Sequence, residues 1–107
     1  MSDTFDKIKQ LVIDDKMRVS QHAFRRMGSH TIASDDLVAS IGSAVVLEDY
    51  PAYYSGRAVL VLQYDANGAP LHADWGIEKD TDEPAVLITT YRPDPAFWSD
   101  DFRTRKP

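Results

Sequence analysis

One short stretch of the chain combines a proton-transfer group with phosphate-binding groups. Residues 18–27 read RVSQHAFRRM and place one of the three histidines beside two arginines. A helix capped by Ser20 would put His22 and Arg26 four residues apart on one face, with Arg25 next to that face. The reference pKa of histidine, about 6.5, suits proton transfer near neutrality, and arginine can hold phosphate oxygens in bidentate fashion. The stretch therefore favours acid/base chemistry on phosphate esters, such as RNA cleavage by the 2′-hydroxyl.

Three residues farther along the chain could complete such a site. A sheet packed against the helix of His22 would bring Tyr91, Arg92 or His72 close to it. Arg92 would then share the phosphate with Arg26, since guanidinium groups match phosphate geometry. Tyr91 would orient the nucleophile or stack on a base.

Each of these side chains also has an ordinary structural role open to it. His22 could bond to the backbone of its capping turn, and Arg26 could pair with Asp49 or Asp74. Tyr91 could simply pack across neighbouring strands. The catalytic and structural readings both remain open from the sequence.

Two other groupings point to different chemistry. Four side chains could in principle ligate a metal ion: His22, His30, His72 and Asp74. Their spacing in the sequence matches no recognised metal site, and the arginines beside His22 would repel a cation, so we expect no metal and no cofactor. A tyrosine cluster could stack on bases or cover the edge of the core: Tyr50, Tyr53 and Tyr54.

Composition indicates one small globular domain. The chain has 107 residues, 43% of them hydrophobic and 27% charged, and it lacks cysteine. This length is typical of a single domain, here taken as 1–107. Without cysteines, disulfides and thiolate metal sites are excluded. The chain begins without a signal peptide pattern and has no apolar run of about 20 residues, so we expect a cytoplasmic protein without membrane contact.

The charge of the chain is unevenly distributed. The net charge of −5 argues against indiscriminate nucleic-acid binding, and we expect no DNA partner. Residues 1–30 carry six basic against four acidic side chains, whereas residues 58–90 carry one against six. Residues 91–107 again carry a slight basic excess. A local cationic site on an acidic protein is compatible with this pattern, and so are plain solvated faces.

Apolar periodicity predicts helices at the start of the chain. Helical spacing extends over 4–13, about 21–29 and about 35–42, with Asp3 or Thr4, Ser20 and Ser34 as respective caps. In the second helix Ala23, Phe24 and Met27 are expected to face inward, and Gly28 to lie near its end.

Strand patterns follow the helices. Four strands are expected over 44–49, 57–64, 71–77 and 85–92, with Pro51 ending the first and Asn67-Gly68 forming a hairpin turn. Segregated helices and strands predict an α+β fold, with two or three helices packed on a four-stranded antiparallel meander. Leu60, Leu62 and Trp75 are expected in the core. Phe97 and Trp98 should dock a terminal turn, and residues 103–107 should fray.

Several motifs together resemble one bacterial family. They are SQHAxxRM at 20–27, EDYP at 48–51, LVL at 60–62, PLH at 70–72 and TTYRPDPxxW at 89–98. The combination is similar to domain-of-unknown-function family number four-two-five-eight, over about residues 18–103. One departure is His30, where the family usually has arginine.

This resemblance implies a fold and a set of site residues. The expected fold is similar to RelE-like ribonuclease toxins, the barnase–EndoU–colicin–RelE group, whose relatives are often paired with antitoxins. The positions it marks are His22, Arg26, His72, Tyr91 and Arg92. Since similarity of fold does not establish activity, two hypotheses follow. One is a metal-independent endoribonuclease of toxin type, with an RNA substrate and an antitoxin-like protein partner. In this hypothesis the catalytic residues are His22, Arg26 and Tyr91, and the substrate-binding residues are Arg25, Arg92, His72 and His30. The other is a non-catalytic protein-binding module, and a small-molecule or metal-dependent enzyme remains a third reading.

Overall fold

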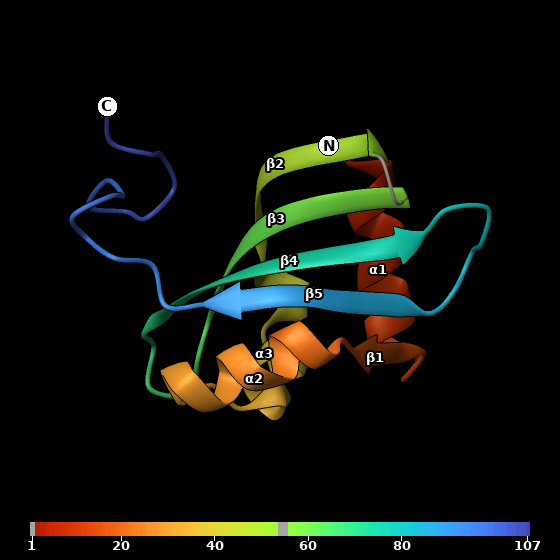
Figure 1. Ribbon diagram of the computed structural model, residues 1–107, viewed down its shortest axis with the longest axis horizontal. Coiled ribbons are helices and arrows are strands. Elements are labelled where there is room, and N and C mark those ends of the chain that lie inside the picture. The colour runs from red at the N-terminus through yellow and green to blue at the C-terminus, as the bar shows by residue number, and fades with distance from the viewer. Residues whose placement is uncertain (1, 54–55) are drawn as a thin grey trace.

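The computed structural model describes residues 2–53 and 56–107, apart from the side chains of residues 52 and 53. The described chain forms three α-helices and a five-stranded sheet (Figure 1). In order these are α1 (Asp3–Ile13), β1 (Met17–Val19), α2 (Gln21–His30), α3 (Ser34–Ala39), the 3-10 helix η1 (Ile41–Ser43), β2 (Val45–Tyr53), β3 (Gly56–Tyr64), β4 (Pro70–Glu78) and β5 (Ala85–Tyr91). The sheet order is β1-β5-β4-β3-β2, and every neighbouring pair except β1 and β5 is antiparallel. The expected α+β class is confirmed.

The sheet differs from the expected four-stranded meander at both edges. β1, which pairs in parallel with β5 from Met17↔Ala85 to Val19↔Leu87, is a fifth strand that the sequence pattern missed. Three residues are too few for a period-two signal to stand out. At the other edge β2 continues through Pro51 instead of ending before it. Proline is tolerated there because an edge strand leaves some N–H groups without a ladder partner, and the β2/β3 register shifts between Tyr50 and Tyr53.

The helices lie where the periodicity predicts them, with different ends. α1 is capped by Ser2, whose side chain accepts a hydrogen bond from the Phe5 amide, rather than by Asp3 or Thr4. α2 is capped by Ser20 as expected and runs past Gly28 to a left-handed residue at Thr31. α3 begins after Ala33 without a side-chain cap and stops at Ala39, since η1 takes over the last expected turn.

The core lies between the helices and one face of the sheet, with α1 behind the sheet in the view of Figure 1. Trp75 is fully buried there, and its indole N–H donates to the buried Gln63 side chain at 2.8 Å. The Gln63 amide in turn donates to the Leu37 carbonyl of α3 at 2.7 Å. This chain satisfies the polar groups that the core encloses and ties α3 to β3.

α2 lies along the outer edge of β5, in the space left beyond the short β1. The Ser20 hydroxyl donates to the Ile88 carbonyl at 2.8 Å, and at the other end Arg92 donates to the His30 carbonyl at 2.9 Å. Ala23 and Met27 are buried, but Phe24 is 72% exposed, which corrects its expected inward position. Phe24 is turned about 100° from Ala23 around the helix axis, and so lies outside the stripe that Ala23 and Met27 bury in the core.

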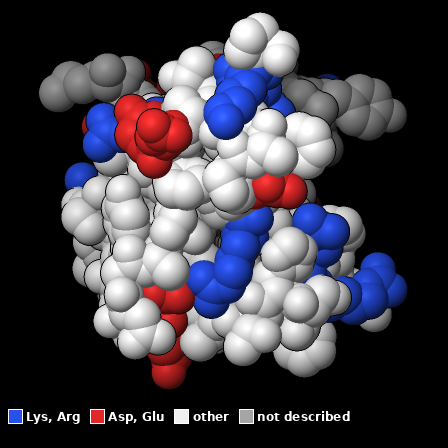
Figure 2. Space-filling view, turned by 90° about the vertical axis from the view of Figure 1, so that its left-hand side faces the viewer, with Lys and Arg blue, Asp and Glu red and all other residues white. Residues whose placement is uncertain are grey.

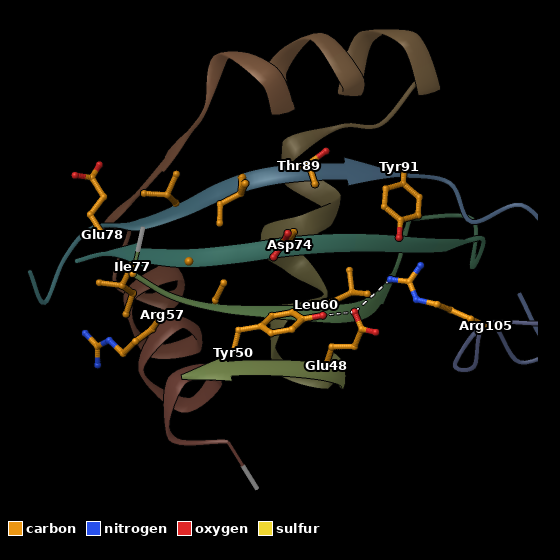
Figure 3. A pocket seen from close by; sticks show the side chains of 15 residues that line it. Glu48, Tyr50, Arg57, Leu60, Asp74, Ile77, Glu78, Thr89, Tyr91 and Arg105 are labelled. Carbon is orange, nitrogen blue, oxygen red and sulfur yellow. Dashed lines mark hydrogen bonds and ion pairs between the residues drawn. The ribbon is translucent and has the colours of Figure 1, made fainter. Parts of the chain in front are cut away.

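The second face of the sheet carries no helix of the described chain, and the C-terminal segment covers one end of it (Figures 1 and 3). The Trp98 side chain is 6% exposed and lies against the His72 ring, with 4.3 Å between ring centroids. Arg105 lies over Trp98 and reaches Glu48 of β2. Residues 103–107 are expected to fray, yet in the structure Lys106 donates from its amide to the Phe97 carbonyl.

No helix in the described part of the chain is both long and apolar enough to cross a membrane.

Candidate functional site

A cavity of about 680 Å³ opens on the helix-free face of the sheet (Figure 3). One end is polar and is lined by Glu48, Tyr50, Asp74, Thr89, Tyr91 and Arg105. The other end is largely apolar and is lined by Ala58, Leu60, Gly76, Ile77, Val86 and Ile88, with Arg57 and Glu78 at its far limit. Its size falls in the range of small-molecule and cofactor sites.

Strand register places the polar residues side by side. Glu48 pairs with Leu60, Leu60 with Asp74, and Asp74 with Thr89, so one row crosses β2, β3, β4 and β5. Tyr91 lies two residues beyond Thr89 on the same face and is therefore a diagonal neighbour of Asp74. Residues far apart in sequence thus face a single space.

Glu48 is the hub of a hydrogen-bonded cluster. One of its carboxylate oxygens accepts from the Tyr50 hydroxyl at 2.6 Å and from the Arg105 guanidinium at 3.3 Å (Figure 3). The bond from Tyr50, with a smaller contribution from Arg105, lowers the pKa of Glu48. The same bond raises the pKa of Tyr50 to about 12. Glu48 is therefore ionised near neutral pH, and its charge is shared between a phenol and a guanidinium.

Asp74 lies in the middle of the cavity floor on β4. Burial, followed by the negative charge of Glu48, raises its pKa to about 6. Its Oδ1 atom is buried and has no hydrogen-bond partner among the described residues. A carboxyl group whose pKa lies near neutrality, with an unused oxygen in a cavity, is suited to general acid/base work.

Tyr91 is oriented by the fully buried His72. His72 Nε2 lies 2.7 Å from the Phe102 carbonyl, which can only accept, so this nitrogen carries the proton. Burial lowers the pKa of His72, so the ring is neutral and its Nδ1 accepts from the Tyr91 hydroxyl at 3.2 Å. The lone pairs of the Tyr91 oxygen are then available toward the cavity. His72, expected to bind substrate, instead contacts Tyr91 and the C-terminal segment.

The structure places the residues of α2 beside this cavity rather than in it. His22 and Arg25 are exposed on the helix surface. Arg26 is partly buried, and its Nε is enclosed without a hydrogen-bond partner among the described residues. Burial raises the pKa of Tyr91, and the positive charges of Arg105 and, more weakly, of Arg26 oppose this shift.

Arg92 and His30 lie away from the cavity. The Arg92 guanidinium donates to the carbonyls of His30 and Thr31, at 2.9 Å each, and to Asp65 at 3.0 Å. The Arg92 amide donates to His30 Nδ1 at 3.3 Å. Successive side chains of a strand point to opposite faces, so with Tyr91 in the cavity Arg92 must face elsewhere. These contacts join β5 to the end of α2.

Sequence reasoning missed Glu48, Tyr50 and Arg105 as partners in one site. Glu48 and Arg105 are 57 residues apart, and no local pattern links them. Asp74 carried a weak signal as a carboxylate in an otherwise apolar, alternating strand. Of the tyrosine cluster, Tyr50 lines the cavity, whereas Tyr54 and the side chain of Tyr53 lie outside the described residues.

The end of the molecule that holds the C-terminal segment carries several separate basic patches and several acidic ones (Figure 2). Arg92, Arg103, Arg105 and Lys106 belong to this part of the chain. Among the described residues, no three histidine, aspartate or glutamate side chains converge as a metal site would require.

Comparison with protein families gives one match. A model of a domain of unknown function, DUF4258, matches residues 19–92. The chain belongs to the DUF4258 family. No curated protein and no solved structure matches it. The DUF4258 match includes Arg26, Glu48, Asp74 and Tyr91 but ends before Arg105, so the C-terminal segment supplies a cavity residue from outside the matched region.

Proposed function

We propose that this DUF4258 domain is a metal-independent endoribonuclease, with its reaction centre at the polar end of the cavity. The observation that carries the proposal is Asp74, a cavity carboxyl group with a pKa of about 6 and an unpartnered oxygen. Near neutral pH it can accept a proton and still be a useful base. The similarity to RelE-like toxins, suggested by the sequence motifs, agrees with this function as an analogy of fold.

The proposed step is an internal transesterification. Asp74 takes the proton of a ribose 2′-hydroxyl, and the 2′-oxygen attacks the adjacent phosphorus. The bond from phosphorus to the 5′-oxygen breaks, and that oxygen receives a proton. The products are a 2′,3′-cyclic phosphate and a 5′-hydroxyl end, so atoms and charge balance without a co-reactant. The Tyr91 ring, held in place by the bond to His72, packs against the ribose and so orients the 2′-hydroxyl toward Asp74.

Two arginines supply positive charge for the phosphate. Arg105 lines the cavity while paired with Glu48, and Arg26 of α2, the helix that lies along β5, has an Nε–H without a partner among the described residues. Arginine donors in fixed positions stabilise the charge that develops on phosphate oxygens. In this scheme Arg105 takes the place in the phosphate clamp that the sequence assigned to Arg92, because the donors of Arg92 are used in binding the end of α2.

His22 is the proposed proton donor to the leaving 5′-oxygen. It lies one helical turn before Arg26 on the same side of α2, and the imidazole side chain is a common proton donor in catalysis. Its exposure fits contact with a strand that extends out of the cavity past α2.

The test is cleavage of single-stranded RNA by the purified protein in the presence of EDTA. We expect cyclic phosphate ends and no cleavage of the all-deoxy strand. Asp74→Asn should reduce the rate by about 10²–10⁴-fold, and His22→Ala should also reduce it. Asp100→Asn, at an exposed carboxylate that does not line the cavity, is the matched control. An inactive wild-type protein, or an Asp74→Asn variant as active as the control, would refute the proposal.

A protein-binding module is the second candidate function, favoured by the exposed Phe24 on α2. A large apolar ring at 72% exposure on a helix surface is typical of contact residues, and an antitoxin-like protein would be the expected partner. Co-purification that is lost in Phe24→Ser, without any RNA cleavage, would favour this function over the first.

A further inference from the structure

The apolar end of the cavity has a low floor between two walls. Tyr50 pairs with Ala58, and Ala58 pairs with Gly76, so the two smallest side chains lie next to each other on β3 and β4. Tyr50 borders this floor on β2, and Ile88 borders it on β5. The floor is therefore low at Ala58 and bordered by Tyr50 on one side and Ile88 on the other.

Gly76 allows one of these walls to lie close to the sheet. A Cβ atom at position 76 would come within 2.7 Å of Ile88 Cδ1 and 3.0 Å of the Arg57 carbonyl oxygen. The Ile88 side chain therefore lies against the bare backbone of β4. Ile88 remains 36% exposed and Tyr50 37% exposed, so both present apolar surface to the cavity opening.

The apolar floor lies a fixed distance from the polar end. Ala58 and Gly76 are each two residues along their strands from Leu60 and Asp74, which corresponds to about 7 Å. A ligand that fills the whole cavity must carry a polar, anionic part at one end and a flat apolar part about 7 Å away. A nucleotide has this form, since its ribose and phosphate adjoin a planar heteroaromatic base.

We infer that the apolar end is a nucleobase site, which holds the base of the nucleotide whose 2′-hydroxyl faces the polar end. This inference rests on the proposed function for the order of the two parts along the RNA strand. The base lies on Ala58, between Tyr50 on one side and Ile88, which covers Gly76, on the other. Contact between a base and an aromatic ring contributes about 5- to 150-fold in affinity.

Binding of small ligands tests this site without any cleavage. Titration calorimetry would compare the four nucleoside 3′-monophosphates with ribose 5-phosphate, which has the sugar and phosphate without a base. At least one nucleotide should bind five-fold or more tightly than ribose 5-phosphate. Equal affinities, or no nucleotide binding at millimolar concentration, would overturn the inference.

Two variants locate the binding. Ala58→Leu places a larger side chain on the floor and should remove the advantage of the nucleotide, whereas Ala66→Leu in the exposed hairpin turn should retain it. Thermal unfolding of both variants shows whether they fold. If Ala58→Leu does not fold, Tyr50→Ala on the edge strand is the substitute, with Tyr50→Phe retaining the ring. Preserved base-dependent binding in Ala58→Leu, or in the substitute, would refute the location.

The outcomes separate the two proposals. Base-dependent binding without RNA cleavage would support the nucleobase site and refute the proposed nuclease activity. Cleavage at equal rates for substrates with and without a base at the attacking ribose would support the nuclease activity and refute the nucleobase site.

Discussion

Asp74→Asn should stabilise the protein at neutral pH and have no such effect in acid. The pKa of Asp74 is raised from 3.8 to about 6 in the folded state, chiefly by burial. The folded state therefore binds this proton more readily than the unfolded state between about pH 4 and pH 6. The stability that the protonated group provides is complete below pH 4 and is lost as the pH rises through 6.

The size of the effect follows from the shift in the pKa. A shift of about two units corresponds to about 3 kcal/mol at full effect. Asp74 is partly exposed, so solvent screening reduces this, and we expect about 1–2 kcal/mol. Asparagine carries no charge at any pH, so the free energy of unfolding of the variant should be higher than that of the wild type by this amount at pH 7.5.

Urea unfolding at half-unit steps from pH 4 to pH 8 measures the difference. Subtracting the wild-type curve removes contributions from other titrating groups such as His72, and any constant effect of the amide appears at every pH. Asp100→Asn is again the control, with an exposed carboxyl group. A difference between Asp74→Asn and wild type that does not change between pH 4 and pH 7.5 would refute the burial of an ionised carboxylate.

Three further results are expected. Leu62→Ala should lower the free energy of unfolding by about 2–5 kcal/mol in urea titrations, because the side chain is fully buried, and an unchanged value would contradict its buried position. Arg92→Ala should lower the free energy of unfolding by about 1–3 kcal/mol in urea titrations, because it removes the hydrogen bonds to the carbonyls of His30 and Thr31. The pattern of RNA cleavage should stay unchanged, and an altered pattern would indicate that Arg92 binds substrate. The rate of RNA cleavage under kcat/KM conditions should rise with pH through about 6 as Asp74 loses its proton, and a flat profile across pH 5–7 would remove Asp74 as the base.

Local sequence signals predicted the main elements because they act within a few residues. Ser20 caps α2 as expected, since an N-cap needs only its own side chain and the amide of Ala23. The apolar run of β3 becomes a central strand, buried on both faces, as such runs do. The Asp65–Gly68 turn forms between β3 and β4, with a left-handed Gly68.

The errors lie where a decision depends on distant parts of the chain. β1 forms because it pairs with the free edge of β5, and a segment of three residues is too short to show the periodicity of a strand. Phe24 is apolar at a helical spacing that fits the core, but only the stripe of α2 with Ala23 and Met27 enters the core, so the Phe24 ring is exposed. Pro51 is a strand breaker in a central strand and is tolerated in β2 because that strand is an edge.

The sequence by itself determined the α+β class, the capped helix that carries His22 and Arg26, and the strand that carries Tyr91. These follow from periodicity and capping, which are properties of neighbouring residues. Tertiary structure alone decided that Tyr91 faces the cavity while Arg92 faces the end of α2, because the register of strand pairing determines which face of the sheet each side chain occupies. It also decided that Glu48, Asp74 and Arg105 share one cavity, since sheet register and a returning C-terminal segment bring them together. The pKa of Asp74 has the same origin, because burial and the charge of a neighbouring strand exist only in the folded chain.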